Sequence, residues 1–341
     1  MPLSAPPATP ITDERPVLVA PDSFKGTLRA AVVAAAIGRG LERGGLVPPD
    51  LMPLADGGEG TLETLLLALG GETHGANVLG PLGAPVKAGF GLLADGDGAV
   101  VEMAQASGLA LVPEAARDAE AASTYGTGEL ILAAVEAGAV VIFLGLGGSA
   151  TTDGGAGALE AISDGGGMRG ARLVVLCDVR TTFSDAATRF GPQKGADAAA
   201  VKRLTQRLER LAESWPRDPR GVAMTGAAGG LAGGLWATLG AELKPGARFV
   251  LDAVDAGSRM RAARAVIVGE GRLDPTTLEG KAAGELATDA RQAGVPCHAI
   301  VGSAALDPFE RRIIDLQTVR EAGTVASLER AAQELALSGV L

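Results

Sequence analysis

Residues 17–26, Val-Leu-Val-Ala-Pro-Asp-Ser-Phe-Lys-Gly, join a short apolar run to a turn that carries both an acid and a base. The same order, an apolar run followed by glycines and charged residues, recurs at 51–60, 141–153 and 265–274. In α/β proteins, a strand that ends in glycine and leads into a helix exposes backbone N–H groups to an anion. Carboxylates in such turns favour metal or proton chemistry. The pattern therefore predicts a protein that handles phosphate.

Short β-branched runs alternate with Ala- and Leu-rich stretches of helical spacing near both ends of the chain. We expect strands at 17–20, 265–268 and 295–301, and helices at 28–43 and 276–293. This alternation is typical of βα units around a mainly parallel sheet, so the sequence predicts an α/β protein.

The middle of the chain has a different pattern. Glycine turns between residues 80 and 98, followed by the apolar run 99–102, predict a hairpin and hence mixed strand pairing. Residues 199–213 predict a charged helix that the proline-containing segment 215–219 ends, and we assign its charges to a solvated face. We interpret the middle as a domain of its own.

Composition limits the function classes. A chain of 341 residues with 47% apolar residues and 50 glycines predicts a soluble, turn-rich globular protein of two domains. A net charge of −10 argues against a general nucleic-acid or membrane surface. Cys177 and Cys297 are too few for a disulfide framework and lack metal-site spacing, so we expect a cytoplasmic protein without zinc. Residues 1–15 lack signal-peptide features and are interpreted as a loose N-terminal tail.

Several charged residues in the turns also fit a purely structural role. Asp56 and Glu59 have the spacing of a capping pair at a helix start. Asp274 precedes a proline, which is a favoured first helical residue, and Asp153 precedes a helix of small residues. Residues 280–281, Gly-Lys, do not form a P-loop, because alanine follows where serine or threonine is required. Capping and chemistry therefore both remain open for these carboxylates.

The lysines favour chemistry over capping. The chain has 24 arginines but only 6 lysines, and three of those lysines, Lys25, Lys194 and Lys281, lie in glycine-containing turns. In a background that prefers arginine, a compact ammonium in a turn indicates a point charge placed on phosphate or on a carboxylate.

The turn segments together resemble the type 1 glycerate kinase family, in family order from about residue 15 to residue 301. Each segment alone is a weak signal, but the ordered set is specific. The segments are Ala-Pro-Asp-Ser-Phe-Lys-Gly-Thr (20–27), Pro-Leu-Ala-Asp-Gly-Gly-Glu-Gly-Thr (53–61), Ser-Thr-Tyr-Gly-Thr-Gly (123–128), Gly-Gly-Ser-Ala-Thr (147–151), Cys-Asp-Val (177–179), Phe-Gly-Pro-Gln-Lys-Gly (190–195) and Gly-Glu-Gly-Arg-Leu-Asp (269–274). The chain departs from the family pattern at Thr181-Thr182, where Asn-Pro is usual, and at Thr276, where Gln is usual.

The resemblance implies a two-domain α/β fold. A flavodoxin-like (Rossmann-type) parallel-sheet domain is expected from residues 16–70 plus 262–341, with a mixed α/β domain, residues 71–261, inserted between them. It also implies an ATP-dependent kinase that phosphorylates D-glycerate, usually to 2-phosphoglycerate, with Mg²⁺ in the cleft between the domains. The partners expected are D-glycerate and ATP, with no nucleic acid and no membrane, in a monomer or homodimer.

Roles for individual residues follow from this resemblance and from phosphoryl-transfer chemistry, where catalysis is mostly positioning and charge neutralisation. Asp178 is expected to be the base, with Lys25 and Arg272 on the anions. Asp274 and Glu270 are candidate magnesium ligands, because magnesium takes oxygen ligands. The residues expected to bind substrate or ATP are Asp22, Ser23, Asp56, Glu59, Gly147, Gly148, Ser149, Thr151, Lys194 and Lys281.

Other functions remain open on sequence grounds. Within the same chemistry, the alternatives are a kinase of a related small hydroxy acid and phosphorylation of the 3-hydroxyl of glycerate. A nicotinamide-dependent oxidoreductase would also use glycine turns, but the first strand is not followed by Gly-x-Gly-x-x-Gly and a later acidic residue. A non-catalytic anion-binding protein would need the glycine turns but not their carboxylates.

Overall fold

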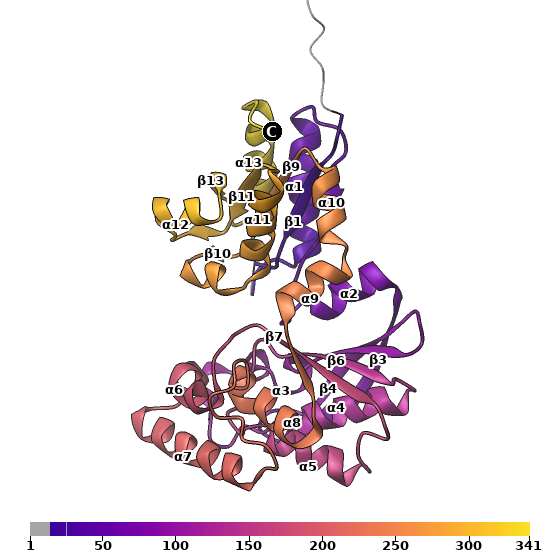
Figure 1. The fold of residues 1–341 in the computed structure, drawn as a ribbon, viewed down its shortest axis with the longest axis vertical. Coiled ribbons are helices and arrows are strands. Elements are labelled where there is room, and N and C mark those ends of the chain that lie inside the picture. The colour runs from indigo at the N-terminus through magenta and orange to yellow at the C-terminus, as the bar shows by residue number, and fades with distance from the viewer. Residues whose placement is uncertain (1–13, 25) are drawn as a thin grey trace, which may run out of the picture.

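The computed structural model describes residues 14–24 and 26–341, and most of its strands form two sheets. In Figure 1 the chain starts in the upper part of the molecule, builds the lower part with its middle, and returns to the upper part at its C-terminus. The predicted tail, 1–15, lies outside the described residues except for Glu14 and Arg15. Both ends of the chain therefore build one part, and the middle builds the other.

The first sheet contains five parallel strands in the order β13-β11-β9-β1-β2. Every residue of its three central strands is buried, as expected for parallel strands covered by helices on both faces. Helices α1 and α13 pack on one face, and α9, α10 and α11 pack on the other. The strand bounds are β1 Val17–Pro21, β2 Asp50–Leu51, β9 Ala265–Gly269, β11 Cys297–Val301 and β13 Leu316–Glu321.

The second sheet contains six strands in the order β3-β4-β5-β6-β7-β8. Strand β4 pairs antiparallel with β3 and β5, whereas the pairs β5–β6, β6–β7 and β7–β8 are parallel. The predicted hairpin and mixed pairing are therefore confirmed. Helices α4 and α8 pack on one face, while α2 and α9 contribute Leu65 and Phe249 to the other. The strand bounds are β3 Gly71–Leu79, β4 Pro85–Leu93, β5 Gly98–Glu102, β6 Val141–Gly145, β7 Arg172–Cys177 and β8 Glu242–Pro245.

The α-helices cover both sheets, and a short parallel pair, β10 Arg272–Leu273 and β12 Ser303–Ala304, lies beyond the first sheet. The helix bounds are α1 Ala30–Arg43, α2 Thr61–Leu69, α3 Ala104–Ser107, α4 Tyr125–Glu136, α5 Ala156–Asp164, α6 Ala186–Phe190, α7 Ala198–Ser214, α8 Leu231–Leu239, α9 Gly246–Ala253, α10 Ala256–Ala262, α11 Ala282–Ala293, α12 Pro308–Ile313 and α13 Val325–Leu337. None of the helices in the described part of the chain has the length and apolar composition needed to cross a membrane.

The predicted fold class, a parallel-sheet domain from both chain ends with an inserted mixed α/β domain, is confirmed. The predicted helix 276–293 is interrupted, because the 3₁₀ turn Pro275–Glu279 precedes α11. The domain boundaries stay a prediction. The predicted boundary between residues 70 and 71 falls at the start of β3, but α2, which lies before this boundary, already packs against the second sheet.

A glycine contact joins the two parts of the molecule. The loop after β2 runs across the carboxyl ends of β6, β7 and β8, where the N–H of Leu146 donates to the carbonyl of Gly57 at 2.9 Å. A Cβ built on Gly147 would lie 2.5 Å from the Cα of Gly58, and one built on Gly246 would lie 2.5 Å from the Cα of Gly57. Only glycine allows these backbones to approach so closely.

We predict that Gly147→Ala destabilises the protein, because its Cβ would meet backbone that cannot rotate away. Overpacking of this kind costs about 1–3 kcal/mol and lowers the melting temperature measured by circular dichroism. Gly75→Ala is the matched control, since a Cβ at Gly75 meets no atom within 4 Å. Equal melting temperatures for the two variants would contradict the glycine contact.

Candidate active site

The first candidate site lies at the carboxyl edge of the five-stranded sheet. Strand β1 has β2 on one side and β9 on the other, so the strand order reverses beside β1. In open α/β sheets, ligands bind at this kind of switch point. Asp22 directly follows β1 and Glu270 directly follows β9, and the N–H of Asp22 donates to the carbonyl of Gly269 at 2.8 Å. Two buried carboxylates therefore stand where a ligand is expected.

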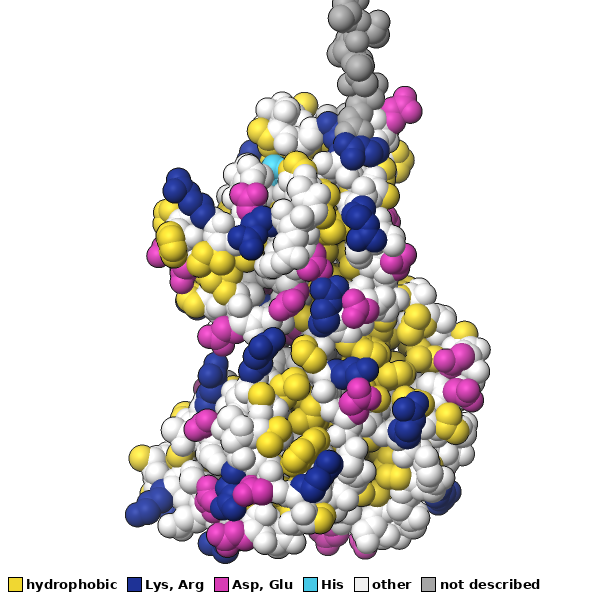
Figure 2. All heavy atoms as spheres, viewed as in Figure 1, with side chains coloured by type: hydrophobic (Ala, Val, Ile, Leu, Met, Phe, Trp, Pro, Cys, Tyr) yellow, Lys and Arg dark blue, Asp and Glu magenta, His cyan; other side chains and the backbone are white. Residues whose placement is uncertain are grey.

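A cavity of about 440 Å³ opens at this edge. Its lining contains both carboxylates and cations, which come from turns that are far apart in the sequence. The predicted residues that line it are Asp22, Ser23, Asp56, Glu270, Arg272 and Lys281. Figure 2 shows charged side chains of both signs along the indentation between the upper and lower parts of the molecule.

Glu270 and Lys281 form the central ion pair of this cavity. The ammonium of Lys281 donates to Oε2 of Glu270 at 2.8 Å and lies 3.6 Å from Oδ1 of Asp274. Thr277 donates its hydroxyl to Oε1 of Glu270 at 2.7 Å. Burial raises the pKa of Glu270, and the charge of Lys281 opposes the shift without cancelling it. The pair is thus held in place at some cost in desolvation.

Asp274 does cap a helical turn, as the structural interpretation suggested. Its carboxylate accepts the N–H of Thr276 at 3.0 Å, and its own N–H donates to the hydroxyl of Thr277 at 3.1 Å. Thr276, which departs from the family pattern, also donates its hydroxyl to Asp274. Burial raises the pKa of Asp274, but the Thr276 hydrogen bonds and the charge of Lys281 outweigh it and hold that pKa below its usual value. Capping does not exclude a second role, since Asp274 is 21% exposed.

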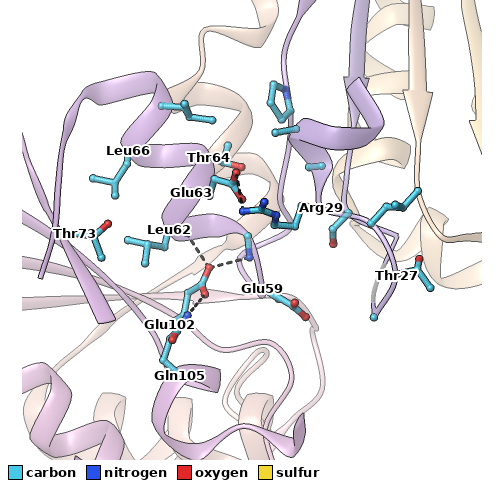
Figure 3. A pocket seen from close by; sticks show the side chains of 18 of the residues that line it. Thr27, Arg29, Glu59, Leu62, Glu63, Thr64, Leu66, Thr73, Glu102 and Gln105 are labelled. Carbon is cyan, nitrogen blue, oxygen red and sulfur yellow. Dashed lines mark hydrogen bonds and ion pairs between the residues drawn. The ribbon is translucent and has the colours of Figure 1, made fainter. Parts of the chain in front are cut away.

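A second cavity, of about 770 Å³, lies beside the first and shares Ser23 and Thr27 with it. Its walls come from the start of α1, from α2 and β3, and from the end of β5 (Figure 3). Of the predicted residues, Ser23 and Glu59 line it.

The interpretation of Asp56 and Glu59 as a capping pair is wrong. Helix α2 begins after Gly60, and Glu102 at the end of β5 accepts the N–H groups of Gly60 and Leu62, each at 2.9 Å. Glu102 is 5% exposed, and burial raises its pKa against these hydrogen bonds. Sequence reasoning missed Glu102, although it ends an apolar run just as the other turn carboxylates do.

A third group of predicted residues is buried beneath the second sheet's carboxyl edge. Lys194 is 1% exposed and donates to the hydroxyl of Ser149 at 2.8 Å and to the carbonyl of Thr151 at 2.5 Å. Burial lowers the pKa of Lys194 to about 7, and the charges of Asp153 and Asp178 oppose the shift. Asp153 accepts the N–H and hydroxyl of Thr124, at 2.8 and 2.7 Å, and the N–H of Gly157 at 3.2 Å, so it has structural partners, but the N-cap of α5 is Gly155 and not Asp153.

A model of the glycerate kinase family matches residues 17–164 and 166–336. The chain belongs to the glycerate kinase family. A glycerate kinase of Halalkalibacterium halodurans is 41% identical over 84% of this chain and 85% of that protein. A glycerate 2-kinase of Escherichia coli is 39% identical over 85% and 86%. A solved structure from Salmonella typhimurium LT2, described as a candidate glycerate kinase 2, is 34% identical, with a TM-score of 0.79 and coverage of 95% and 98%. The predicted family and enzyme class, phosphotransferase, are thereby confirmed.

The remaining family motifs fall into different places. Lys25 lies outside the described residues. Asp178 follows β7 and is half-buried, and the lining of the two cavities includes neither Asp178 nor Lys194. Gly147 is needed for its contact with Gly58, and Gly148 has a φ of +75°. The structure thus brings six predicted residues into the smaller cavity. Ser149, Thr151 and Lys194 are instead buried outside both cavities.

The titration of Lys194 gives a test of its burial. The folded-state pKa of about 7 lies below the ordinary 10.5, so between these pH values the unfolded chain binds more protons. Stability supplied through this group therefore rises with pH across that window. We predict that the unfolding free energy of wild type minus that of Lys194→Met rises by up to about 1.4 kcal/mol per pH unit.

Urea unfolding at about pH 7.5 and about pH 9 measures this difference. Lys202→Met, on the exposed face of α7, is the control and should follow wild type at both pH values. Parallel pH dependence of wild type and Lys194→Met would contradict a titrating buried ammonium.

Proposed function

We propose that the protein phosphorylates D-glycerate at the 2-hydroxyl with ATP, in the cleft between the two sheets. The observation that carries this proposal is the cavity at the switch point, where Asp22, Asp56 and Glu270 lie with Arg272 and Lys281. Mixed carboxylates and cations suit a phosphoryl group whose charge must be neutralised and positioned. Family membership supports the substrate, and the name of the Escherichia coli relative supports the 2-hydroxyl.

In the reaction that we propose, the 2-hydroxyl oxygen of glycerate attacks the γ-phosphorus of ATP, the bond to the β-phosphate oxygen breaks, and ADP leaves. Asp178 takes the hydroxyl proton. Arg272, which is 68% exposed, and Lys281 contact the phosphates, with Lys25 as a further cation. The carboxyl ends of both sheets meet at the Asp56–Gly58 loop, which supports a shared site for these groups.

The buried loop residues have supporting roles in this proposal. Gly148, Ser149 and Thr151 hold a turn that Lys194 ties down by two hydrogen bonds. Gly147 keeps that turn against the Asp56 loop. Their contribution to substrate binding is then the placement of backbone N–H groups near the anion.

Magnesium would be held by Asp274 and Glu270. Carboxylate oxygens fit this ion, and magnesium in kinase sites is bound by one or two carboxylates together with phosphates and water. The described residues contain no group of three or more His, Cys, Asp or Glu side chains suited to a metal ion, so the two carboxylates would supply only part of the ligands and phosphates and water the rest. Lys281 already contacts both carboxylates, so the two cations would share this site. The ion supplies charge neutralisation on the phosphates.

We predict that ATP turnover requires both D-glycerate and a divalent cation. Coupled ADP detection with each component omitted in turn measures this, and ³¹P NMR distinguishes 2-phosphoglycerate from 3-phosphoglycerate. ATP hydrolysis at the same rate without D-glycerate would contradict the proposal. Formation of 3-phosphoglycerate would contradict only the assigned hydroxyl.

We also propose a cytoplasmic location and a monomer or homodimer.

For Asp178→Asn we predict a fall in kcat of about 100-fold or more, because the amide cannot accept the hydroxyl proton. The melting temperature should change little, since asparagine is isosteric. Asp185→Asn, in the exposed turn that follows, is the control and should keep wild-type kcat. A folded Asp178→Asn enzyme with full activity would remove Asp178 from proton transfer.

A further inference from the structure

The two cavities lie next to one another at the carboxyl end of β1. Both are lined by Ser23 and Thr27, so one elongated ligand placed along these two residues would reach both cavities. The larger cavity, of about 770 Å³, has the size that encloses a drug-sized ligand, about 300–1,000 Å³. Glycerate, with few heavy atoms, would leave most of this space to water.

The two cavities differ in charge. The smaller one carries Arg272 and Lys281 beside its carboxylates. The larger one carries Glu59, Glu63 and Glu102 with Arg29, whose guanidinium is 3.8 Å from Oε1 of Glu63. Among the described residues its charges are mainly acidic, and these carboxylates would repel a triphosphate or the carboxylate of glycerate. It fits the uncharged part of a ligand, with hydroxyl or N–H groups that donate to carboxylates.

One wall of the larger cavity is apolar. Leu62 and Leu66 of α2 and Thr73 of β3 lie along one side in Figure 3, and Thr27 lies on the opposite side. Leu67, which is 66% exposed, adds to the same lining. A wall of leucine side chains with a few polar groups suits a flat heterocycle.

Glu102 is placed to bind hydroxyl groups at this wall. Its Oε1 is held by the N–H groups of Gly60 and Leu62, so the orientation of the carboxylate is set by backbone. Its Oε2 has a longer contact, 3.5 Å, with the amide of Gln105. A carboxylate oxygen accepts two hydrogen bonds, so Oε2 keeps capacity for a donor from a ligand. Acidic residues bind ribose hydroxyls in this way in other α/β folds.

We propose that the larger cavity binds the adenosine part of ATP. The base lies against Leu62 and Leu66, the ribose donates to Glu102, and the phosphates pass Ser23 and Thr27 to reach Arg272 and Lys281. This inference rests on the proposed function, because it names the half of the site that takes the nucleotide. It leaves the region beyond the phosphates, toward the second sheet's carboxyl edge, for glycerate.

Thr73→Trp tests the assignment, since Thr73 is exposed on β3 and lines the cavity, so an indole there would take up part of the space proposed for the base. Calorimetry with ADP and with inorganic tripolyphosphate separates the base from the phosphates. We expect the Kd for ADP to rise at least about tenfold while the Kd for tripolyphosphate changes less than about twofold. Asn77→Trp is the matched control, because Asn77 is exposed on the same face of β3 but does not line the cavity.

Leu67→Gln is the second variant, for use if Thr73→Trp does not fold; it removes apolar surface from the wall without adding charge and should weaken ADP in the same selective way. Unchanged ADP binding in a folded Thr73→Trp protein, or equal weakening of ADP and tripolyphosphate, would overturn the inference. So would failure of the wild-type protein to bind ADP. Wild-type protein that binds ADP as expected but does not phosphorylate D-glycerate would overturn the proposed function alone.

Discussion

The contact between the Asp56–Gly58 loop and the carboxyl ends of β6, β7 and β8 is the constraint on which the site depends. It brings the loop after β2 of the first sheet directly onto the second sheet, with backbone atoms so close that no side chain fits between them. The ends of two separate sheets thereby face one another across a single loop. Asp56 on this loop lines the smaller cavity, and Glu59, three residues later, lines the larger one.

The parts of the fold that were predictable from sequence are those with a local signal. Strands β1, β9 and β11 are continuous apolar runs, and α7 is an amphipathic charged helix with an Asp197 cap, so periodicity alone located them. The interruption between η6 (Pro275–Glu279) and α11 was missed, because a run of helical spacing conceals a 3₁₀ turn that ends at Gly280 in left-handed conformation. The order of strands in each sheet depends on packing, which periodicity does not report.

The lining of the candidate site could be predicted in part for the same reason. Asp22 and Glu270 directly follow β1 and β9, and the parallel arrangement brings the ends of those strands together. The carboxylate that accepts the first N–H groups of α2 could not be predicted. Glu102 is 42 residues from Gly60 in sequence, and only the second sheet brings the two into contact. The three turn lysines shared one sequence signal, yet Lys194 is a buried support and Lys281 lines a cavity. Neighbouring glycines indicate a turn, but they do not indicate whether the lysine side chain in that turn is buried or faces a cavity.

Burial and charge distinguish the buried carboxylates of the two cavities. Glu270 and Glu102 both have raised pKa values, because the desolvation of each carboxylate outweighs the hydrogen bonds and cations around it. A cation that approaches such a carboxylate recovers part of this desolvation cost, whereas an anion adds repulsion. At Glu270 the cation is Lys281, whose ammonium donates to Glu270 at 2.8 Å and has longer contacts with Asp274, at 3.6 Å, and with the carbonyl of Arg272, at 3.5 Å. At Glu102 the partners in the described part of the chain are the neutral N–H groups of Gly60 and Leu62 and the amide of Gln105, which agrees with the proposal that this end takes the uncharged part of a ligand. Within the described residues, the two cavities therefore differ in whether a lysine lies beside the buried carboxylate, as Lys281 does beside Glu270.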